Sequence, residues 1–171
     1  MKNVNFTILV VEDDPNDQIL IKTAFRKAGV TEAIQTVSNG EEALAYLQGK
    51  GPFADRDTYQ YPTFILMDLK MPKMDGFEVL AHLKESPEWR IIPTVIFSAS
   101  GDLDDIKQAY ALGACSYHIK PASSDDMRKQ LKLLYDYWMT CEIPQVDVTG
   151  KQLETVSRGK MSEHAAEIAK A

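Results

Sequence analysis

Cysteine is scarce in this 171-residue sequence, which contains only Cys115 and Cys141. The two lie far apart and lack the close spacing of metal-binding cysteines, so we expect two reduced thiols and neither a disulfide framework nor a zinc site. Positive charge is also scarce, because the formal net charge is −6 and the pI is about 5.1. Since phosphate contacts need a basic face, we expect no nucleic-acid binding.

Long hydrophobic runs are missing as well. No apolar stretch approaches the roughly 18 residues that a membrane span needs, and residues 1–5 lack the charged-then-apolar pattern of a signal peptide. We therefore expect a cytoplasmic protein without membrane contact. Hydrophobic residues nevertheless make up 44% of the chain. That content and this length predict one ordinary domain with a real core.

Short apolar runs alternate with helical patterns along the chain. Strands are predicted at 6–11, 33–37, 63–67, 93–97 and 115–119, and helices at about 15–28, 41–49, 76–86, 102–112 and 123–140. The central strands are nearly continuous in apolar residues, as strands covered on both faces are. Five β–α units in this order predict an α/β fold with a parallel sheet and helices on both faces.

Two segments fit this pattern less simply. The stretch 49–62 is a long loop whose aromatic residues Phe53, Tyr59 and Tyr61 suggest local packing. The polar stretch 144–171 is too short for an effector domain of usual size. We therefore divide the chain into a domain over 1–143 and a flexible or partly helical tail over 144–171.

Carboxylates follow two of the predicted strands. Glu12, Asp13 and Asp14 come after the first strand, and Asp68 comes after the third. The carboxyl ends of strands in an open parallel sheet are where ligands bind. Acids gathered there would repel one another unless a cation holds them, and oxygen-only clusters suit Mg²⁺. The sequence therefore predicts a magnesium site and metal-assisted chemistry on an aspartate.

Four motifs at strand ends together resemble the receiver domains of two-component response regulators, over roughly residues 5–140. They are Val11-Glu12-Asp13-Asp14, Met67-Asp68-Leu69-Lys70-Met71-Pro72 with Asp75-Gly76, Phe97-Ser98-Ala99, and Tyr117-His118-Ile119-Lys120-Pro121. The resemblance implies a flavodoxin-like, doubly wound sheet of five strands in the order 2-1-3-4-5 with five helices.

The resemblance also implies roles for the acids. Asp68 would be the phosphoacceptor, attacking a phosphohistidine to form an aspartyl phosphate. Glu12, Asp13 and Asp68 would bind Mg²⁺, together with the backbone carbonyl of Lys70. The alternative is that the acids after the first strand cap the first helix, which suits Asp14, the residue before Pro15, best.

Further residues would bind the phosphoryl group and transmit its presence. Lys120, the hydroxyl of Ser98 and the backbone N–H of Ala99 would contact phosphoryl oxygens. Ser98 would move toward the group, and Tyr117 would fill the space left behind. The alternative for Tyr117 is an ordinary half-buried strand tyrosine. The resemblance further implies a cis bond between Lys120 and Pro121.

The expected partners are proteins. The resemblance implies phosphorylation by a sensor histidine kinase or phosphotransfer protein, and output through an unknown downstream protein. The long loop and the ending from Tyr137 to Pro144 are similar to small regulators paired with phytochrome-type kinases. The aromatic residues Tyr135, Tyr137 and Trp138, with the segment 141–144, exceed what one amphipathic face needs. We expect these aromatic residues to be exposed, and exposed aromatics of this kind predict a homodimer through the fifth helix and this segment.

Three alternatives have different chemistry. A haloacid-dehalogenase-type phosphatase also uses an aspartate after a strand, but it needs a second aspartate two residues later, where this chain has Lys70. A flavodoxin-like electron carrier needs a phosphate loop after the first strand, where Glu12, Asp13 and Asp14 would repel a phosphate. A pseudo-receiver scaffold would lack the key residues, and all of them are present. We therefore expect a phosphorylation-switched binding module that is not an enzyme acting on external substrates.

Overall fold

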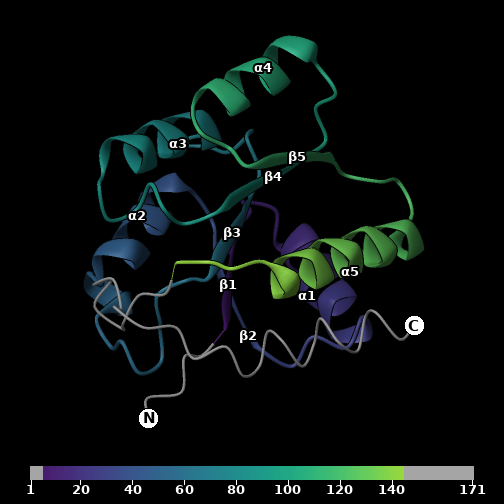
Figure 1. The fold of residues 1–171 in the computed structure, drawn as a ribbon, viewed down its shortest axis with the longest axis horizontal. Helices are drawn as coiled ribbons and strands as arrows, with labels where there is room; N and C mark the ends of the chain where they lie inside the picture. The colour runs from purple at the N-terminus through teal and green to yellow at the C-terminus, as the bar shows by residue number, and fades with distance from the viewer. Residues whose placement is uncertain (1–5, 145–171) are drawn as a thin grey trace.

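The computed structural model describes residues 6–144 of the chain. The expected tail therefore lies outside the described residues, apart from Pro144. Within residues 6–144, five strands alternate with five α-helices, and a short 3₁₀ helix follows the second α-helix (Figure 1). Their bounds are β1 Thr7–Val11, α1 Pro15–Lys27, β2 Ala33–Val37, α2 Gly40–Gln48, η1 Gly51–Phe53, β3 Phe64–Met67, α3 Gly76–Glu85, β4 Thr94–Ser98, α4 Leu103–Ala111, β5 Ser116–Ile119 and α5 Ser124–Thr140.

All five strands are parallel and lie in the order β2-β1-β3-β4-β5, as predicted. The inner strands β1, β3 and β4 are buried along their whole length, because helices cover both faces of the sheet. The edge strand β5 is only partly buried. Each predicted strand starts and ends within one residue of the observed one.

Alternating strand side chains divide the interior into two cores. Leu9 and Val11 point to the core that α2, α3 and α4 cover, whereas Ile8 and Val10 point to the core beneath α1 and α5. Helices α1 and α5 lie side by side on that second face (Figure 1). The segments that follow β1, β3 and β5 meet at the carboxyl ends of the strands, where Lys120 contacts Glu12 and Asp68.

Side-chain caps fix where the helices begin. Asp14 accepts a hydrogen bond from the Asn16 N–H at the start of α1, and Pro15 occupies the first turn, so the capping role expected of Asp14 is confirmed. Asp75 and Glu78 form a reciprocal capping box at α3. Caps of this kind each contribute about 1 kcal/mol.

The loop between α2 and β3 packs locally, as its aromatic residues predict. Phe53 and Tyr59 contact the ring of Tyr46, with centroids 5.3 and 6.0 Å away. Arg56 closes the loop, because its guanidinium donates to the backbone oxygens of Leu47 at 2.6 Å and Tyr59 at 3.0 Å. The loop is therefore an ordered part of the domain.

The aromatic end of α5 differs from the expectation. Tyr135 is only 4% exposed and belongs to the core, because its ring packs on Phe6. Trp138 is half-buried and stacks on Phe64. The large side chains that α5 exposes are Leu133 and Tyr137, so the prediction of three exposed aromatics was wrong for Tyr135 and only partly right for Trp138.

Cys115 and Cys141 are free thiols, as expected. Among residues 6–144, no helix is long and apolar enough to span a membrane.

Candidate metal and phosphoryl site

Strand ends bring the predicted site residues to one edge of the sheet. Glu12 follows β1, Asp68 follows β3 and Lys120 follows β5. Backbone hydrogen bonds extend the sheet by one residue at each point: the Asp68 N–H donates to Val11 O at 3.0 Å, and the Lys120 N–H donates to Ser98 O at 2.8 Å. These residues are therefore positioned as rigidly as the strands that precede them.

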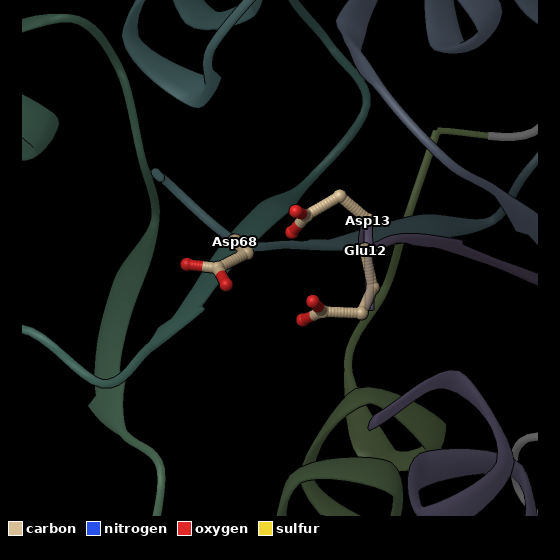
Figure 2. Close-up of side chains that lie close together, drawn as sticks. All are labelled: Glu12, Asp13 and Asp68. Carbon is tan, nitrogen blue, oxygen red and sulfur yellow. The ribbon is translucent and has the colours of Figure 1, made fainter. Parts of the chain in front are cut away.

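Glu12, Asp13 and Asp68 form an acidic cluster. One carboxylate oxygen from each lies within 4.8 Å of the others, and Figure 2 shows the three side chains close together. Glu12 is 2% exposed and Asp68 is 8% exposed. An oxygen-only set of this size suits a hard divalent cation, so these residues fit the predicted Mg²⁺. The carbonyl of Lys70 as a fourth ligand stays a prediction.

Lys120 offsets part of the negative charge of this cluster. Its Nζ lies 2.5 Å from Glu12 Oε2, 3.0 Å from Asp68 Oδ2 and 2.9 Å from Asp17 Oδ2. Burial alone would lower the pKa of Lys120, but its hydrogen bonds to Glu12 and Asp17 and the charge of Asp68 raise that pKa above its ordinary value. The ammonium group therefore stays charged and offsets the acids around it.

Burial has the opposite effect on Glu12. It raises the pKa of Glu12 to about 7, although the hydrogen bond from Lys120 and the charge of Lys120 both lower it. Burial thus makes it costly to keep this carboxylate ionised, and a cation beside it offsets that cost.

The carboxylate of Asp68 is oriented by two different partners. Its Oδ1 accepts a hydrogen bond from the Leu69 N–H at 2.7 Å, and its Oδ2 faces Lys120 at 3.0 Å. The side chain is thus held at the edge of the sheet beside a fixed positive charge. A carboxylate in this setting can act as a nucleophile toward an electrophile whose negative charge Lys120 stabilises.

Ser98, Ala99 and Tyr117 lie around the β4–α4 loop. Ser98 is fully buried at the end of β4, and its Oγ accepts a hydrogen bond from the Ser100 N–H at 3.3 Å. Tyr117 is half-buried, and its hydroxyl donates to Ser100 O at 2.8 Å. Ala99 is exposed beside the site. The structure therefore connects Ser98 and Tyr117 through Ser100, a residue that no sequence motif singled out.

The peptide bond between Lys120 and Pro121 is trans, whereas a cis bond was predicted. No cis peptide bond occurs among residues 6–144, so the prediction of a cis Lys120–Pro121 bond was wrong. An X–Pro bond prefers trans by about 0.5–1 kcal/mol. The trans form here already carries Lys120 Nζ to Asp68, so the position of the lysine does not require the rarer isomer.

Three contacts involve residues that sequence reasoning missed. Asp17 is a third carboxylate partner of Lys120, and Gln18 Nε2 donates to the backbone oxygen of Glu12 at 2.6 Å. A signal for Asp17 was available, because it lies in the first turn of the helix that follows the acidic motif. Lys70 Nζ lies 3.2 Å from Asp105 Oδ2, a contact between distant segments that no local pattern reveals.

The family model of the response regulator receiver domain matches residues 8–132 of this chain. Among curated proteins, the probable methanogenesis regulatory protein FilR2 of Methanothrix harundinacea is 37% identical over 134 residues, which is 78% of this chain and 84% of FilR2.

Solved structures agree with this match. Response regulator RPA3017 in red light signalling of R. palustris superposes with a TM-score of 0.78 at 33% identity, over 82% of this chain and 99% of that one. The phosphorylated cyanobacterial phytochrome response regulator RcpA gives 0.76 at 36% identity over the same shares. The Mn²⁺-bound form of response regulator Rcp1, a Synechocystis protein, gives 0.72 at 31% identity over 81% of this chain and 99% of that one.

Proposed function

The chain belongs to the response regulator receiver domain family, and we propose that Asp68 is the residue on which it accepts the phosphoryl group. Receiver domains take phosphoryl groups from histidine kinases or phosphotransfer proteins, so the protein acts in phosphorelay signal transduction. One observation carries the assignment to Asp68. Its buried carboxylate contacts Lys120 and belongs to the acidic cluster, as that of Glu12 does, but it is the member of the cluster that follows the central strand β3.

The transfer is a substitution at phosphorus. An oxygen of Asp68 attacks the phosphorus of a phosphohistidine, the P–N bond breaks, and its electrons remain on the imidazole nitrogen of the donor. Asp68 then carries an acyl phosphate. Lys120 lies where it can pair with the phosphoryl oxygens, and this charge stabilisation is the main catalytic term in phosphoryl transfer.

The metal would be held by Glu12, Asp13 and Asp68, with the Lys70 carbonyl as a further oxygen ligand. Bound Mg²⁺ supplies positive charge that offsets the carboxylates and the phosphoryl oxygens. The donor set supports this proposal, and so does the Mn²⁺-bound form of the related regulator Rcp1.

Ser98, the Ala99 N–H and Lys120 would receive the phosphoryl oxygens. Phosphorylation adds about −1.5 to −2 in charge, which draws the Ser98 hydroxyl toward the group and away from Ser100. Tyr117 would then release Ser100 O and turn toward the space that Ser98 leaves. The face around β4, α4 and β5 changes shape as a result, and this changes which protein binds there.

Intact-mass measurement tests the assignment. With Mg²⁺ and acetyl phosphate, the wild type should gain the mass of one phosphoryl group, and Asp68→Asn should gain none. Asp14→Asn is the matched control, because asparagine caps α1 equally well and this residue lies outside the acidic cluster. Equal labelling of Asp68→Asn and the wild type would refute the assignment.

The proposal includes the absence of turnover on external substrates. Lys70 occupies the position where a phosphatase of the haloacid-dehalogenase type would need its acid. Incubation with a phosphomonoester such as p-nitrophenyl phosphate should therefore release no product beyond that of an Asp68→Asn control. Release that depends on Asp68 would favour the phosphatase.

A phytochrome-type kinase is the proposed donor. The support is the similarity to RcpA and to RPA3017, which belong to phytochrome and red light signalling respectively. Transfer from a purified phytochrome kinase should be faster than from an unrelated histidine kinase at equal concentration. Equal rates from both would remove this part of the proposal.

A homodimer through α5 is the proposed assembly. Leu133 is 71% exposed and Tyr137 is 60% exposed, beside a mostly apolar groove of about 440 Å³ between β5 and α5. Light scattering with and without phosphodonor should give a dimer that Leu133→Ser and Tyr137→Ser weaken. Ile19→Ser, an equally drastic change at the exposed Ile19 of α1, should have no such effect. A monomer under both conditions would refute the dimer.

A further inference from the structure

Lys70 and Asp105 form an ion pair that joins the loop after Asp68 to the first turn of α4. Lys70 Nζ lies 3.2 Å from Asp105 Oδ2 and 5.8 Å from the centre of the Phe77 ring on α3. The Lys70 side chain is 63% exposed, whereas that of Asp105 is 19% exposed. The Lys70 side chain therefore reaches from the loop after β3 to α4. Among the described residues, Asp105 is the one carboxylate with which it forms an ion pair.

Asp105 is itself held in place. The Ser100 hydroxyl donates a hydrogen bond to Asp105 Oδ2 at 2.6 Å, to the same oxygen that Lys70 contacts. The hydrogen bond from Ser100 and then that from Lys70 lower the pKa of Asp105. An acid in the first turn of a helix is also favoured by the helix dipole. Asp105 is thus an ionised, oriented carboxylate.

Ser100 connects this ion pair to Ser98 and Tyr117, the two residues that are proposed to move on phosphorylation. Its N–H donates to Ser98 Oγ at 3.3 Å, and its carbonyl oxygen accepts from the Tyr117 hydroxyl at 2.8 Å. One residue therefore contacts Asp105, Ser98 and Tyr117. Any movement of Ser98 or Tyr117 that shifts the Ser100 backbone also disturbs the carboxylate that binds Lys70.

We propose that Asp105 is a positioning residue that holds Lys70 in the unphosphorylated protein, and that Lys70 exchanges Asp105 for the oxygens of the phosphoryl group on Asp68. This inference rests on the proposed function. Lys70 is two residues beyond Asp68, and its flexible four-carbon stem allows it to turn toward the site. The phosphoryl group attracts it more strongly than Asp105, because it carries about −1.5 to −2 in charge.

The exchange has two consequences. Lys70 at the phosphoryl oxygens obstructs the water that hydrolyses the acyl phosphate, which must attack phosphorus in line as the O–P bond to Asp68 breaks and inorganic phosphate leaves. The loss of Lys70 also removes one of the contacts that hold α4 against the loop after β3. The ion pair of Lys70 and Asp105 therefore influences both how long the phosphoryl group stays on Asp68 and how readily α4 moves on phosphorylation.

The test is a double-mutant cycle on Lys70→Met and Asp105→Asn, with beryllofluoride and Mg²⁺ as a phosphoryl mimic. Asp105→Asn should tighten beryllofluoride binding by about two- to five-fold, the range for an exposed ion pair, and should slow loss of phosphate after acetyl phosphate is removed. Lys70→Met should weaken binding and speed phosphate loss. Asp105→Asn should have no further effect in the Lys70→Met background, because the exchange is then impossible.

The control is Asp104→Asn, which removes the same charge from the same turn of α4 at an exposed position. Equal effects of the Asp104 and Asp105 variants, or an unchanged effect of Asp105→Asn in the Lys70→Met background, would overturn the inference. Asp105→Glu should restore wild-type behaviour. Equal binding of beryllofluoride to the wild type and to Asp68→Asn would refute the proposed function, and the inference that rests on it would be refuted too.

Discussion

Gly76 lies so close to Asp68 that a side chain cannot be added there without moving the backbone. A Cβ built on Gly76 would fall 2.4 Å from the carbonyl oxygen of Asp68 and 2.8 Å from the Cα of Leu69. The Gly76 N–H also donates to Leu69 O at 3.0 Å. The first turn of α3 is therefore packed directly against the backbone of the proposed phosphoacceptor.

Gly76→Ala should consequently destabilise the protein by about 1–3 kcal/mol, the cost of overpacking, although alanine is the better helix former by about 1 kcal/mol. It should also slow labelling by acetyl phosphate, because the Asp68 backbone must shift. Chemical denaturation and intact mass measure the two effects. Gly101→Ala is the control, since its Cβ would meet only the flexible end of Ile119 at 3.3 Å. A stabilised Gly76→Ala variant would contradict the packing argument.

Lys120→Met should destabilise the metal-free protein, because it leaves Glu12 and Asp68 buried without their cation. Removing one partner of a buried pair costs about 3–5 kcal/mol, and we expect the lower end because Glu12, with a pKa of about 7, can take up a proton. Mg²⁺ should restore more stability to this variant than to the wild type. Thermal denaturation with and without Mg²⁺ measures the metal-free stability and the stabilisation by Mg²⁺. Equal stabilisation of the two proteins by Mg²⁺ would count against a site in which Lys120 and the metal offset the same carboxylates. Lys129→Met, at an exposed pair, is the control.

Asp13→Asn should remove most of the stabilisation by Mg²⁺. A ligand at about ten times its dissociation constant stabilises the folded state by about 1.4 kcal/mol, and loss of one carboxylate ligand weakens binding enough to erase most of that gain. Melting temperatures over a Mg²⁺ titration test this expectation. Asp14→Asn should respond as the wild type does, because Asp14 caps α1. Identical titration curves for the two variants would exclude Asp13 as a ligand.

Local patterns predicted the fold closely, for physical reasons that individual residues make visible. The buried inner strands are continuous apolar runs, and the caps Asp14, Asp75 and Ser123 fix where helices begin. The acidic cluster was predictable as well, because the topology alone carries Glu12 and Asp68 to adjacent strand ends.

The contacts that the sequence could not predict depend on side chains meeting across distant segments. Tyr135 looked like a surface aromatic, yet the packing of Phe6 against α5 buries it. The pair of Lys70 and Asp105 joins the loop after β3 to the first turn of α4, two segments that no periodic pattern relates. The isomer before Pro121 was also beyond reach, because the two forms differ intrinsically by only about 0.5–1 kcal/mol.

His118 should make stability depend on pH. Burial lowers the pKa of this histidine, whose Nδ1 lies 3.5 Å from Gln130 Nε2 beside α5. The unfolded chain therefore binds a proton more readily than the folded one, so stability is full above about pH 6.5 and falls as pH drops through the folded pKa. The His118→Gln variant has no such titratable group, so its stability should not fall for this reason. The stability of the wild type relative to the variant should decrease between pH 7 and pH 5 in denaturation experiments. Substitution of the exposed His82 by glutamine serves as the control. If the stability of the wild type decreased equally relative to both variants, burial of His118 would not be the cause.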